Sequence, residues 1–210
     1  EALNRLMAIE EGRIALRRKT QPLINQTTAV ILAGGESSRM GYTPKISLML
    51  GDYSFGEQIL YSLQCFDEVF LSLRESTPQK PLPLPVLTDI IPDIGAIGGI
   101  YTSLSLCKTP FVFVVPSDTP FVTEELIRFI FSQYQEGDDC VIPIIGDKCH
   151  PLLGIYKKTA LPVIEGLIKA KNYRIMSIFP PLKTHYVSLP PSYSKQFQNI
   201  NTPEEYKAIK

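Results

Sequence analysis

The stretch AVILAGGESSRMGYTPK, residues 29–45, passes from an apolar run into glycines and then into two separated basic residues. The β-branched run at 29–33 predicts a buried strand. Gly34 and Gly35 permit close approach of the backbone to a ligand. Successive N–H groups beside Arg39 and Lys45 form a nest that suits anionic oxygens. A tight turn would explain the glycines but not the two cations, so the stretch predicts a strand followed by a phosphate-binding loop.

Apolar, strand-like segments alternate with helical patterns along the rest of the chain. Strands are expected at 68–73, 86–87, 111–115, 140–145 and 151–156, and helices at 55–66, from near Gly99, at 123–135 and around 158–170. Near the end, Thr202, Pro203 and Glu205 occupy the N-cap, first and third positions of a capping box. The alternation predicts an α/β fold with a mainly parallel sheet, which places ligands at the carboxyl ends of its strands.

Length and charge restrict the class of protein. The 210 residues suit one well-buried domain. Residues 27–210 are assigned to it, and residues 1–26 are predicted to be a charged helix with a Pro-interrupted link, either an N-terminal extension or the tail of an upstream module. Basic and acidic residues balance at 21 each, which argues against a nucleic-acid partner. No apolar run approaches the length of a membrane span, and a signal peptide is not evident.

The cysteines and histidines indicate no metal centre. The four cysteines lack CxxC spacing and lie in or beside apolar segments, so we expect reduced structural thiols and a cytoplasmic protein. The two histidines are far apart in the sequence. His150, beside Pro151, is expected to be a structural turn residue.

A lone carboxylate follows the most apolar predicted strand, in the segment VVPSDTPFV at 114–122. Asp118 could cap a turn, or it could hold Mg²⁺, since this hard cation prefers carboxylate oxygens and shares its shell with substrate phosphates. Such an ion would neutralise charge during phosphoryl transfer. The pattern therefore makes Asp118 a candidate metal ligand.

Four segments in order resemble the molybdenum cofactor guanylyltransferases, a family of nucleotidyltransferases. The loop after the first strand resembles L-A-G-G-x-x-x-R-M-G-x-D-K, with Pro44 in place of the family's Asp. The segment GAIGGI at 95–100 resembles G-P-L-x-G-I, with Ala96 in place of Pro. Asp118 begins a match to D-x-P-F, and NINTPE at 199–204 matches N-x-N-T-P-E. The resemblance covers residues 28–210.

The resemblance implies a three-layer α/β/α, Rossmann-like nucleotidyltransferase fold, that of the nucleotide-diphospho-sugar transferases. It implies transfer of GMP from GTP to molybdopterin cofactor, with release of pyrophosphate and with Mg²⁺ as cofactor. Further partners would be molybdoenzymes or their chaperones. Neither nucleic acid nor a membrane is an expected partner.

The resemblance also assigns site residues, with Arg39, Lys45 and Asp118 as catalytic residues and Asp118 as the metal ligand. N–H groups from Leu32 to Gly35 are expected to hold phosphates and sugar. The expected GTP-binding residues are Leu32, Ala33, Gly34, Gly35, Lys45, Asp89, Gly95 and Asp118. Those expected on the acceptor side are Arg174, Asn199 and Asn201. Turn chemistry remains an alternative for the two asparagines, and helix packing for the glycines at 95–99.

Two departures from the family pattern leave other functions open. Pro44 precedes Lys45, as in sugar and isoprenoid nucleotidyltransferases, and Ser72-Leu73-Arg74 stands where the family has an Asn. One alternative is a related nucleotidyltransferase that uses CTP or another nucleotide with a different phosphate acceptor. Another is a catalytically silent nucleotide-binding module or chaperone.

Overall fold

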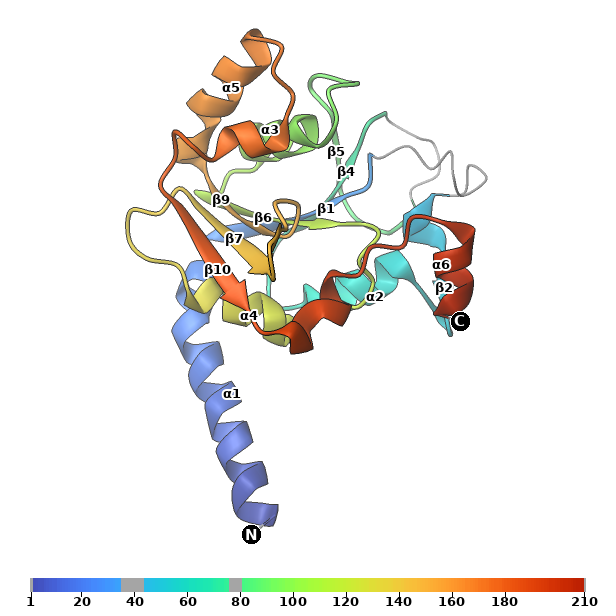
Figure 1. Cartoon of the computed structure of the whole chain (residues 1–210), viewed down its shortest axis with the longest axis vertical. Coiled ribbons are helices and arrows are strands. Elements are labelled where there is room, and N and C mark those ends of the chain that lie inside the picture. The colour runs from blue at the N-terminus through green and yellow to red at the C-terminus, as the bar shows by residue number, and fades with distance from the viewer. Residues whose placement is uncertain (1, 35–43, 76–80, 210) are drawn as a thin grey trace.

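The molecule is built around a mainly parallel sheet. A computed structural model of the chain describes residues 2–34, 44–75 and 81–209. In these residues the main sheet runs in the order β10-β7-β9-β6-β1-β4-β5, with β8 paired to β7 (Figure 1). The strands are β1 Thr27–Leu32, β4 Val69–Leu73, β5 Val86–Thr88, β6 Phe111–Pro116, β7 Cys140–Ile145, β8 Lys148–Cys149, β9 Gly154–Lys157 and β10 Thr184–Leu189.

Strand β1 is the centre of the parallel half of the sheet. It pairs in parallel with β4 on one side and β6 on the other, and β4 pairs in parallel with β5. Strand β9 is antiparallel to both β6 and β7. Ala29, Val30 and Ile31 are 0% exposed, as expected for an apolar strand covered on both faces. The buried strand predicted at 29–33 is thereby confirmed.

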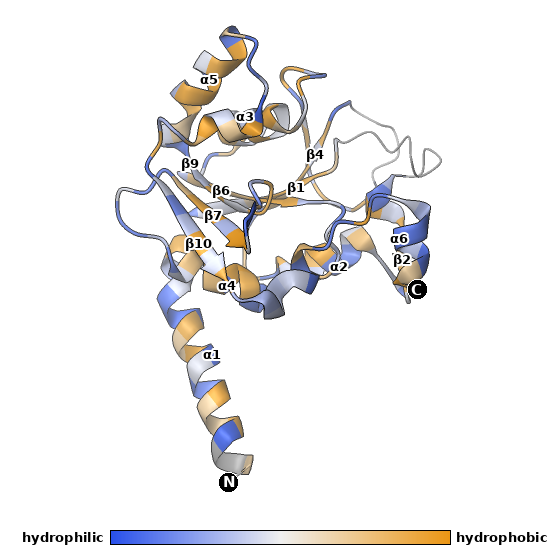
Figure 2. Ribbon diagram, in the orientation of Figure 1, coloured by the Kyte–Doolittle hydropathy of each residue, from blue (hydrophilic) through white to orange (hydrophobic). Residues whose placement is uncertain are grey.

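Helices cover both faces of this sheet, which confirms the predicted three-layer α/β/α fold. Helices α3 Ala96–Leu106 and α5 Leu161–Lys169 lie on one face, and α2 Phe55–Ser62 and α4 Glu124–Ser132 lie on the other (Figure 1). Apolar residues gather along the central strands (Figure 2). The remaining elements are α1 Ala2–Ile24, α6 Pro203–Ala208, the hairpin β2 Met49–Leu50 with β3 Tyr53–Ser54, and the 3-10 turns η2 Lys45–Ser47, η3 Lys158–Ala160, η4 Ile175–Ile178 and η5 Pro191–Phe197.

Helix α1 differs from the sequence prediction. It continues through Pro22 to Ile24, so the predicted Pro-interrupted link is wrong. The end of the helix is fixed to α4, because Arg128 donates to Thr20 Oγ1 at 3.1 Å and to Gln21 Oε1 at 2.9 Å. Burial of Ile24 adds to this anchorage. The rest of α1 projects away from the sheet (Figure 1), and its interpretation as an extension or an upstream tail stays a prediction.

Several other boundaries are shifted by a few residues, among them the end of α2 at Ser62 rather than 66 and the end of α4 at Ser132 rather than 135. Helix α3 begins at Ala96 rather than near Gly99, because Gly95 adopts a φ of 74° and starts the helix earlier. Strand β9 begins at Gly154, whereas the strand was predicted from residue 151. There the chain turns instead, with the Leu153 N–H donating to the His150 carbonyl at 3.1 Å.

All four cysteines are free, and Cys107 and Cys140 are buried. Burial raises the pKa of Cys65 and of Cys107 to about 11, which makes these thiols poor nucleophiles. Within the described ranges, no helix combines the length with the apolar character that crossing a membrane requires.

Candidate active site

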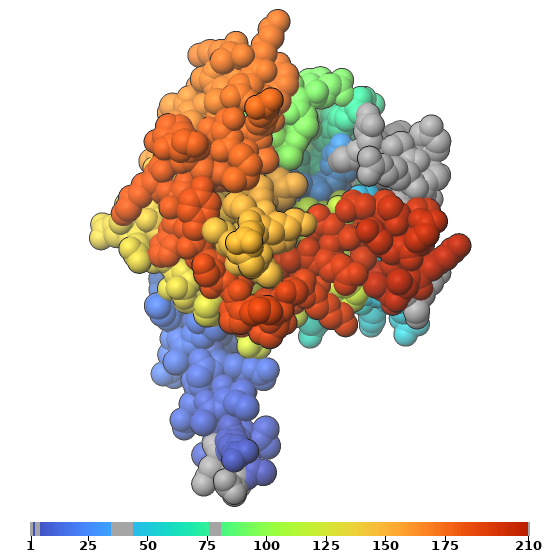
Figure 3. Space-filling view, viewed as in Figure 1, coloured from blue at the N-terminus to red at the C-terminus, as the bar shows by residue number. Residues whose placement is uncertain are grey.

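A cleft of about 480 Å³ lies at the carboxyl ends of the parallel strands β6, β1, β4 and β5. Figure 3 shows a recess on this face, between the green segment that contains α3 and the red C-terminal segment. Seven of the predicted GTP-binding residues line the cleft: Leu32, Ala33, Gly34, Lys45, Asp89, Gly95 and Asp118. The eighth, Gly35, lies outside the described residues, as does Arg39. The sheet therefore brings together residues that the sequence places in separate motifs.

One end of the cleft is lined by Lys45 and Asp118, and Asn201 contacts Lys45 there. The Lys45 ammonium donates to Asp118 Oδ2 at 3.2 Å and to Asn201 Oδ1 at 2.5 Å. The side chains of Lys45 and Asp118 are only 18% and 17% exposed. Lys45 and Asn201 are 156 positions apart in the chain, so the C-terminal segment directly fixes the loop lysine.

The C-terminal segment is held in place independently of this contact. The Ile200 N–H donates to the Asp118 carbonyl at 3.0 Å, and the Ile200 side chain is buried against Leu48 and Phe55. The predicted capping box is present, with Thr202 Oγ1 accepting from the Glu205 N–H at 3.2 Å. Asn201 is thus fixed between a buried side chain and a capped helix.

Asp118 has the chemistry of a cation ligand. Its Oδ1 is a buried oxygen for which the described residues supply no hydrogen-bond partner, although such oxygens are normally satisfied. Groups of three or more His, Cys, Asp or Glu side chains able to hold a metal are also absent from these residues. Mg²⁺ commonly takes one or two carboxylates and completes its shell with phosphates and water. The unsatisfied oxygen therefore fits a single-carboxylate Mg²⁺ site that substrate phosphates complete.

The opposite end of the cleft lies over β4 and β5 and contains Ser72, Arg74, Asp89 and Asp93. The Ser72 hydroxyl lies 3.4 Å from Asp89 Oδ1. Partial burial raises the pKa of Asp89, and the bond from Ser72 opposes that rise. Asp93 is an exposed loop residue that pairs with the Arg74 guanidinium at 2.6 Å.

The glycines near the cleft have different roles. A Cβ on Gly34 would lie 3.1 Å from the Arg74 backbone nitrogen, and one on Gly99 would lie 3.1 Å from Leu32 Cδ2. These two therefore allow close packing of the loop and of α3 against the sheet. Gly95 lines the cleft with its positive φ.

The loop backbone at Ala33 corrects one expectation. Its N–H donates to the Ser72 carbonyl at 2.9 Å and so extends the sheet by one bond. The expectation that this N–H holds a phosphate is therefore wrong. Ala33 contributes to the wall of the cleft.

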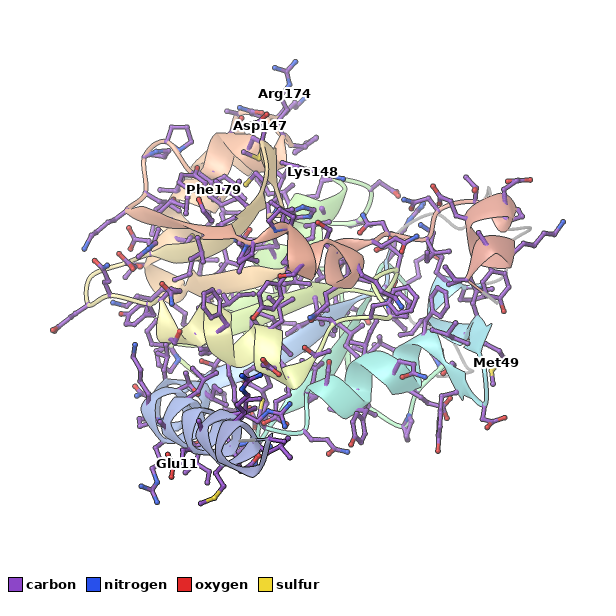
Figure 4. The ribbon with its side chains drawn as sticks, turned by 60° about the horizontal axis from the view of Figure 1, so that its bottom comes forward. Glu11, Met49, Asp147, Lys148, Arg174 and Phe179 are labelled. Carbon is purple, nitrogen blue, oxygen red and sulfur yellow. The ribbon has the colours of Figure 1, made fainter. Side chains whose placement is uncertain are left out.

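The acceptor-side candidates are not all brought together. Asn201 contacts Lys45, whereas Asn199 is exposed, and neither asparagine is among the cleft-lining residues. Arg174 is exposed too, and its side chain points outward (Figure 4). The roles of Asn199 and Arg174 on the acceptor side stay predictions.

His150 has the structural role that the sequence predicted. Its ring packs on Phe197 with the centroids 4.6 Å apart, and its backbone N–H donates to the Pro143 carbonyl at 2.9 Å. Burial, with a smaller contribution from Lys148, lowers the pKa of His150 to about 4. The folded protein therefore favours the neutral imidazole.

This lowered pKa predicts a loss of stability in acid. The contribution is fully present above the ordinary pKa of 6.5 and is lost as pH falls from there toward about 4. Because the ring is only half buried, solvent screening limits the effect to about 1 kcal/mol, or about 2–4 °C in Tm. His150→Phe should remove this part of the decline in Tm between pH 7 and pH 4.5. Identical declines in parent and variant would contradict the assignment.

Sequence reasoning missed Arg74 as a cleft residue and treated its segment only as a departure from a family pattern. It also missed the direct contact between Asn201 and Lys45. A signal for Arg74 was present, because it directly follows the strand predicted at 68–73, beside the strand that leads into the glycine loop. Ends of neighbouring parallel strands meet at one edge of the sheet.

Comparisons with known proteins agree with this geometry. The model of the MobA-like NTP transferase domain matches residues 29–185. A probable molybdenum cofactor guanylyltransferase of Flavobacterium johnsoniae is 30% identical over 85% of this chain and 93% of its own, and one of Clostridium perfringens is 31% identical over 87% and 95%. The solved structure of molybdopterin-guanine dinucleotide biosynthesis protein A from Archaeoglobus fulgidus superposes with a TM-score of 0.73, at 26% identity, over 87% of this chain and 96% of that one. This chain belongs to the MobA-like NTP transferase family.

Proposed function

We propose that this chain transfers GMP from GTP to molybdopterin cofactor, in a Mg²⁺-dependent reaction that forms molybdopterin guanine dinucleotide and releases pyrophosphate. The observation that carries the proposal is the cluster of Lys45, Asp118 and Asn201 at one end of a cleft that a nucleotide could span. The names of the similar enzymes support the choice of substrates. The product would pass to molybdoenzymes or their chaperones.

The two ends of the cleft suit different parts of GTP. Lys45 offers a cation to the phosphates, and the Asp118 oxygen lies beside it. Successive strands of a sheet are about 4.8 Å apart, so β6 and β5, three spacings apart, are separated by about 14 Å. The base would lie over β4 and β5, where Asp89 can accept hydrogen bonds from N1–H and the exocyclic amine of guanine.

The reaction needs no protein nucleophile. A phosphate oxygen of molybdopterin attacks the α-phosphorus of GTP, a new P–O bond forms, and the bond from that phosphorus to the pyrophosphate oxygen breaks. Lys45 stabilises the negative charge that develops on pyrophosphate, and the Asn201 contact keeps its ammonium in position. Catalysis then consists of positioning and preorganised electrostatics.

Asp118 would hold Mg²⁺ through the oxygen that has no protein partner. When bound, the ion would neutralise phosphate oxygens and increase the electrophilicity of the α-phosphorus. The Lys45 bond to the other carboxylate oxygen orients Asp118 and would leave Oδ1 available to a cation.

Release of pyrophosphate from GTP, measured with and without molybdopterin and with GTP, CTP and ATP compared, tests the proposal. We expect release with GTP, dependent on both acceptor and Mg²⁺. Faster release with CTP would identify a related nucleotidyltransferase with another base preference. Binding of GTP with no release, even with acceptor present, would identify a silent nucleotide-binding module.

The assignment of Asp89 to the base predicts an effect that depends on the nucleotide. Asp89→Asn should bind GTP about tenfold more weakly, because a hydrogen bond to a charged group contributes roughly 1.5–3 kcal/mol against about 1 for a neutral one. Inosine triphosphate lacks the exocyclic amine, so the variant should also discriminate less between GTP and ITP. Titration calorimetry of parent and variant at fixed Mg²⁺ measures both quantities.

The outcomes for Asp89→Asn are distinct. An equal loss of affinity for GTP and ITP would place Asp89 on the ribose or the metal. Unchanged affinity for both would remove it from the nucleotide site. Asp147→Asn serves as a matched control, because Asp147 is an exposed acid in the turn between β7 and β8 (Figure 4).

A further inference from the structure

An arginine lies in the base end of the cleft, held by a specific partner. Arg74 follows directly after β4 and lines the cleft, with its side chain 37% exposed. Its Nη2 lies 2.6 Å from Asp93 Oδ1, whereas Glu75 lies 4.0 Å from Nε. The short contact to Asp93 is a charge-assisted hydrogen bond and restricts where the guanidinium can point.

The backbone at both residues supports this placement. Asp93 adopts a φ of 63°, which is uncommon for a residue with a side chain. Such a conformation persists where the surrounding structure enforces it, and it is frequent at functional sites. On the other side, the backbone of Arg74 is packed against Gly34 so closely that a Cβ there would lie 3.1 Å from the Arg74 nitrogen. Gly34 thus fixes the Arg74 backbone, and Asp93 fixes its guanidinium.

The charges at this end do not suit a phosphate. Arg74 shares it with the carboxylates of Asp89 and Asp93, so the acids outnumber the base among these three side chains. A triphosphate would be repelled there and attracted to Lys45, about two strand spacings, or about 10 Å, away across β1. Arg74 therefore faces a part of the ligand that carries no net charge.

Guanine offers complementary groups to Arg74 and Asp89. Its N1–H and amine are donors that suit the Asp89 carboxylate, and its adjacent O6 and N7 are acceptors. A guanidinium has five N–H donors in a planar fork, so Arg74 can donate to Asp93 and to a ligand together. Adenine has an amine donor in place of O6, which an arginine cannot bind.

We propose that Arg74, positioned by Asp93, donates hydrogen bonds to O6 and N7 of guanine and selects this base over adenine. The inference rests on the proposed function, since it deepens the account of GTP as the substrate. Arg74 is a specificity residue, and Asp93 is a positioning residue that acts through it. Together with Asp89, Arg74 would contact guanine along two adjacent edges.

The test compares GTP, ATP and 7-deaza-GTP, which lacks the N7 acceptor, by titration calorimetry at fixed Mg²⁺. The parent should bind 7-deaza-GTP about tenfold more weakly than GTP, and ATP more weakly still. Arg74→Ala should lose at least about tenfold in GTP affinity and bind GTP and 7-deaza-GTP alike. Arg74→Lys retains the charge without the fork, so it should also lose most of this discrimination.

The controls separate a base contact from other roles. Glu75 is 77% exposed and lies 4.0 Å from Arg74 Nε. Glu75→Gln removes this distant charge and should bind the nucleotides as the parent does. Asp93→Asn suits the positive φ and should reduce the ratio of GTP to 7-deaza-GTP affinity without abolishing GTP binding. Arg74→Ala retains the Cβ that lies near Gly34, and its melting temperature verifies folding.

Two results would overturn the inference. Equal losses for all nucleotides in Arg74→Ala, with the parent ratio preserved, would place Arg74 on the ribose or phosphates. Unchanged affinities would reduce the pair with Asp93 to a structural contact. A parent protein that does not bind GTP at all would instead contradict the proposed function, and the two failures are therefore distinguishable.

Discussion

Asp118→Asn is expected to lower kcat for pyrophosphate release by about 10³-fold or more, with the fold intact. Stabilisation by a bound cation amounts to several kcal/mol, which corresponds to that factor. In the variant the amide oxygen would accept from Lys45, and the amide NH₂ would occupy the position of the buried Oδ1. An NH₂ group is a donor and cannot bind a cation.

The fold should survive this change because the Asp118 contact with Ile200 is made by the backbone carbonyl. Melting temperature and the pyrophosphate assay together measure both parts of the prediction, with Asp147→Asn as the matched control. Near-normal, Mg²⁺-dependent turnover in Asp118→Asn would remove this carboxylate from the mechanism.

Lys45→Ala is expected to lower kcat by about 10²–10³-fold, the usual loss when one preorganised group that stabilises developing charge is removed. The loss should fall mainly on kcat rather than on KM, because charge accumulates on the departing pyrophosphate in the transition state. Steady-state pyrophosphate release over a range of GTP concentrations separates the two constants.

Lys148→Ala is the matched control, since Lys148 is an exposed lysine at the start of β8 (Figure 4). It should retain parental turnover. If Lys45→Ala raised KM at unchanged kcat, Lys45 would contribute to ground-state binding of GTP and not to the chemical step.

The sequence predicted the layered fold and most of one side of the cleft because those features are local. The run at 29–33 is apolar throughout, as a strand covered on both faces must be. The capping box at Thr202 depends on residues within three positions of one another. Asp118 could be predicted to lie at the cleft because a lone carboxylate after a buried strand has few structural uses.

What the sequence could not predict depends on contacts between distant segments. Lys45 and Asn201 each had a plausible local interpretation, and only folding reveals their bond. The early start of α3 depends on the positive φ of Gly95. A glycine in the sequence permits this conformation but does not require it. The interruption expected at Pro22 did not occur, because burial of Ile24 and the bonds from Arg128 outweigh the missing N–H.

The bonds from the C-terminal segment to Asp118 and Lys45 have a consequence for biosynthesis. A nascent chain synthesised as far as Phe197 already contains every strand of the main sheet in the described residues, but it lacks both Ile200 and Asn201. A polypeptide released early by the ribosome could therefore assemble its sheet and still lack a fixed lysine at the cleft. Completion of translation would then act as a checkpoint that keeps incomplete products from consuming nucleotide.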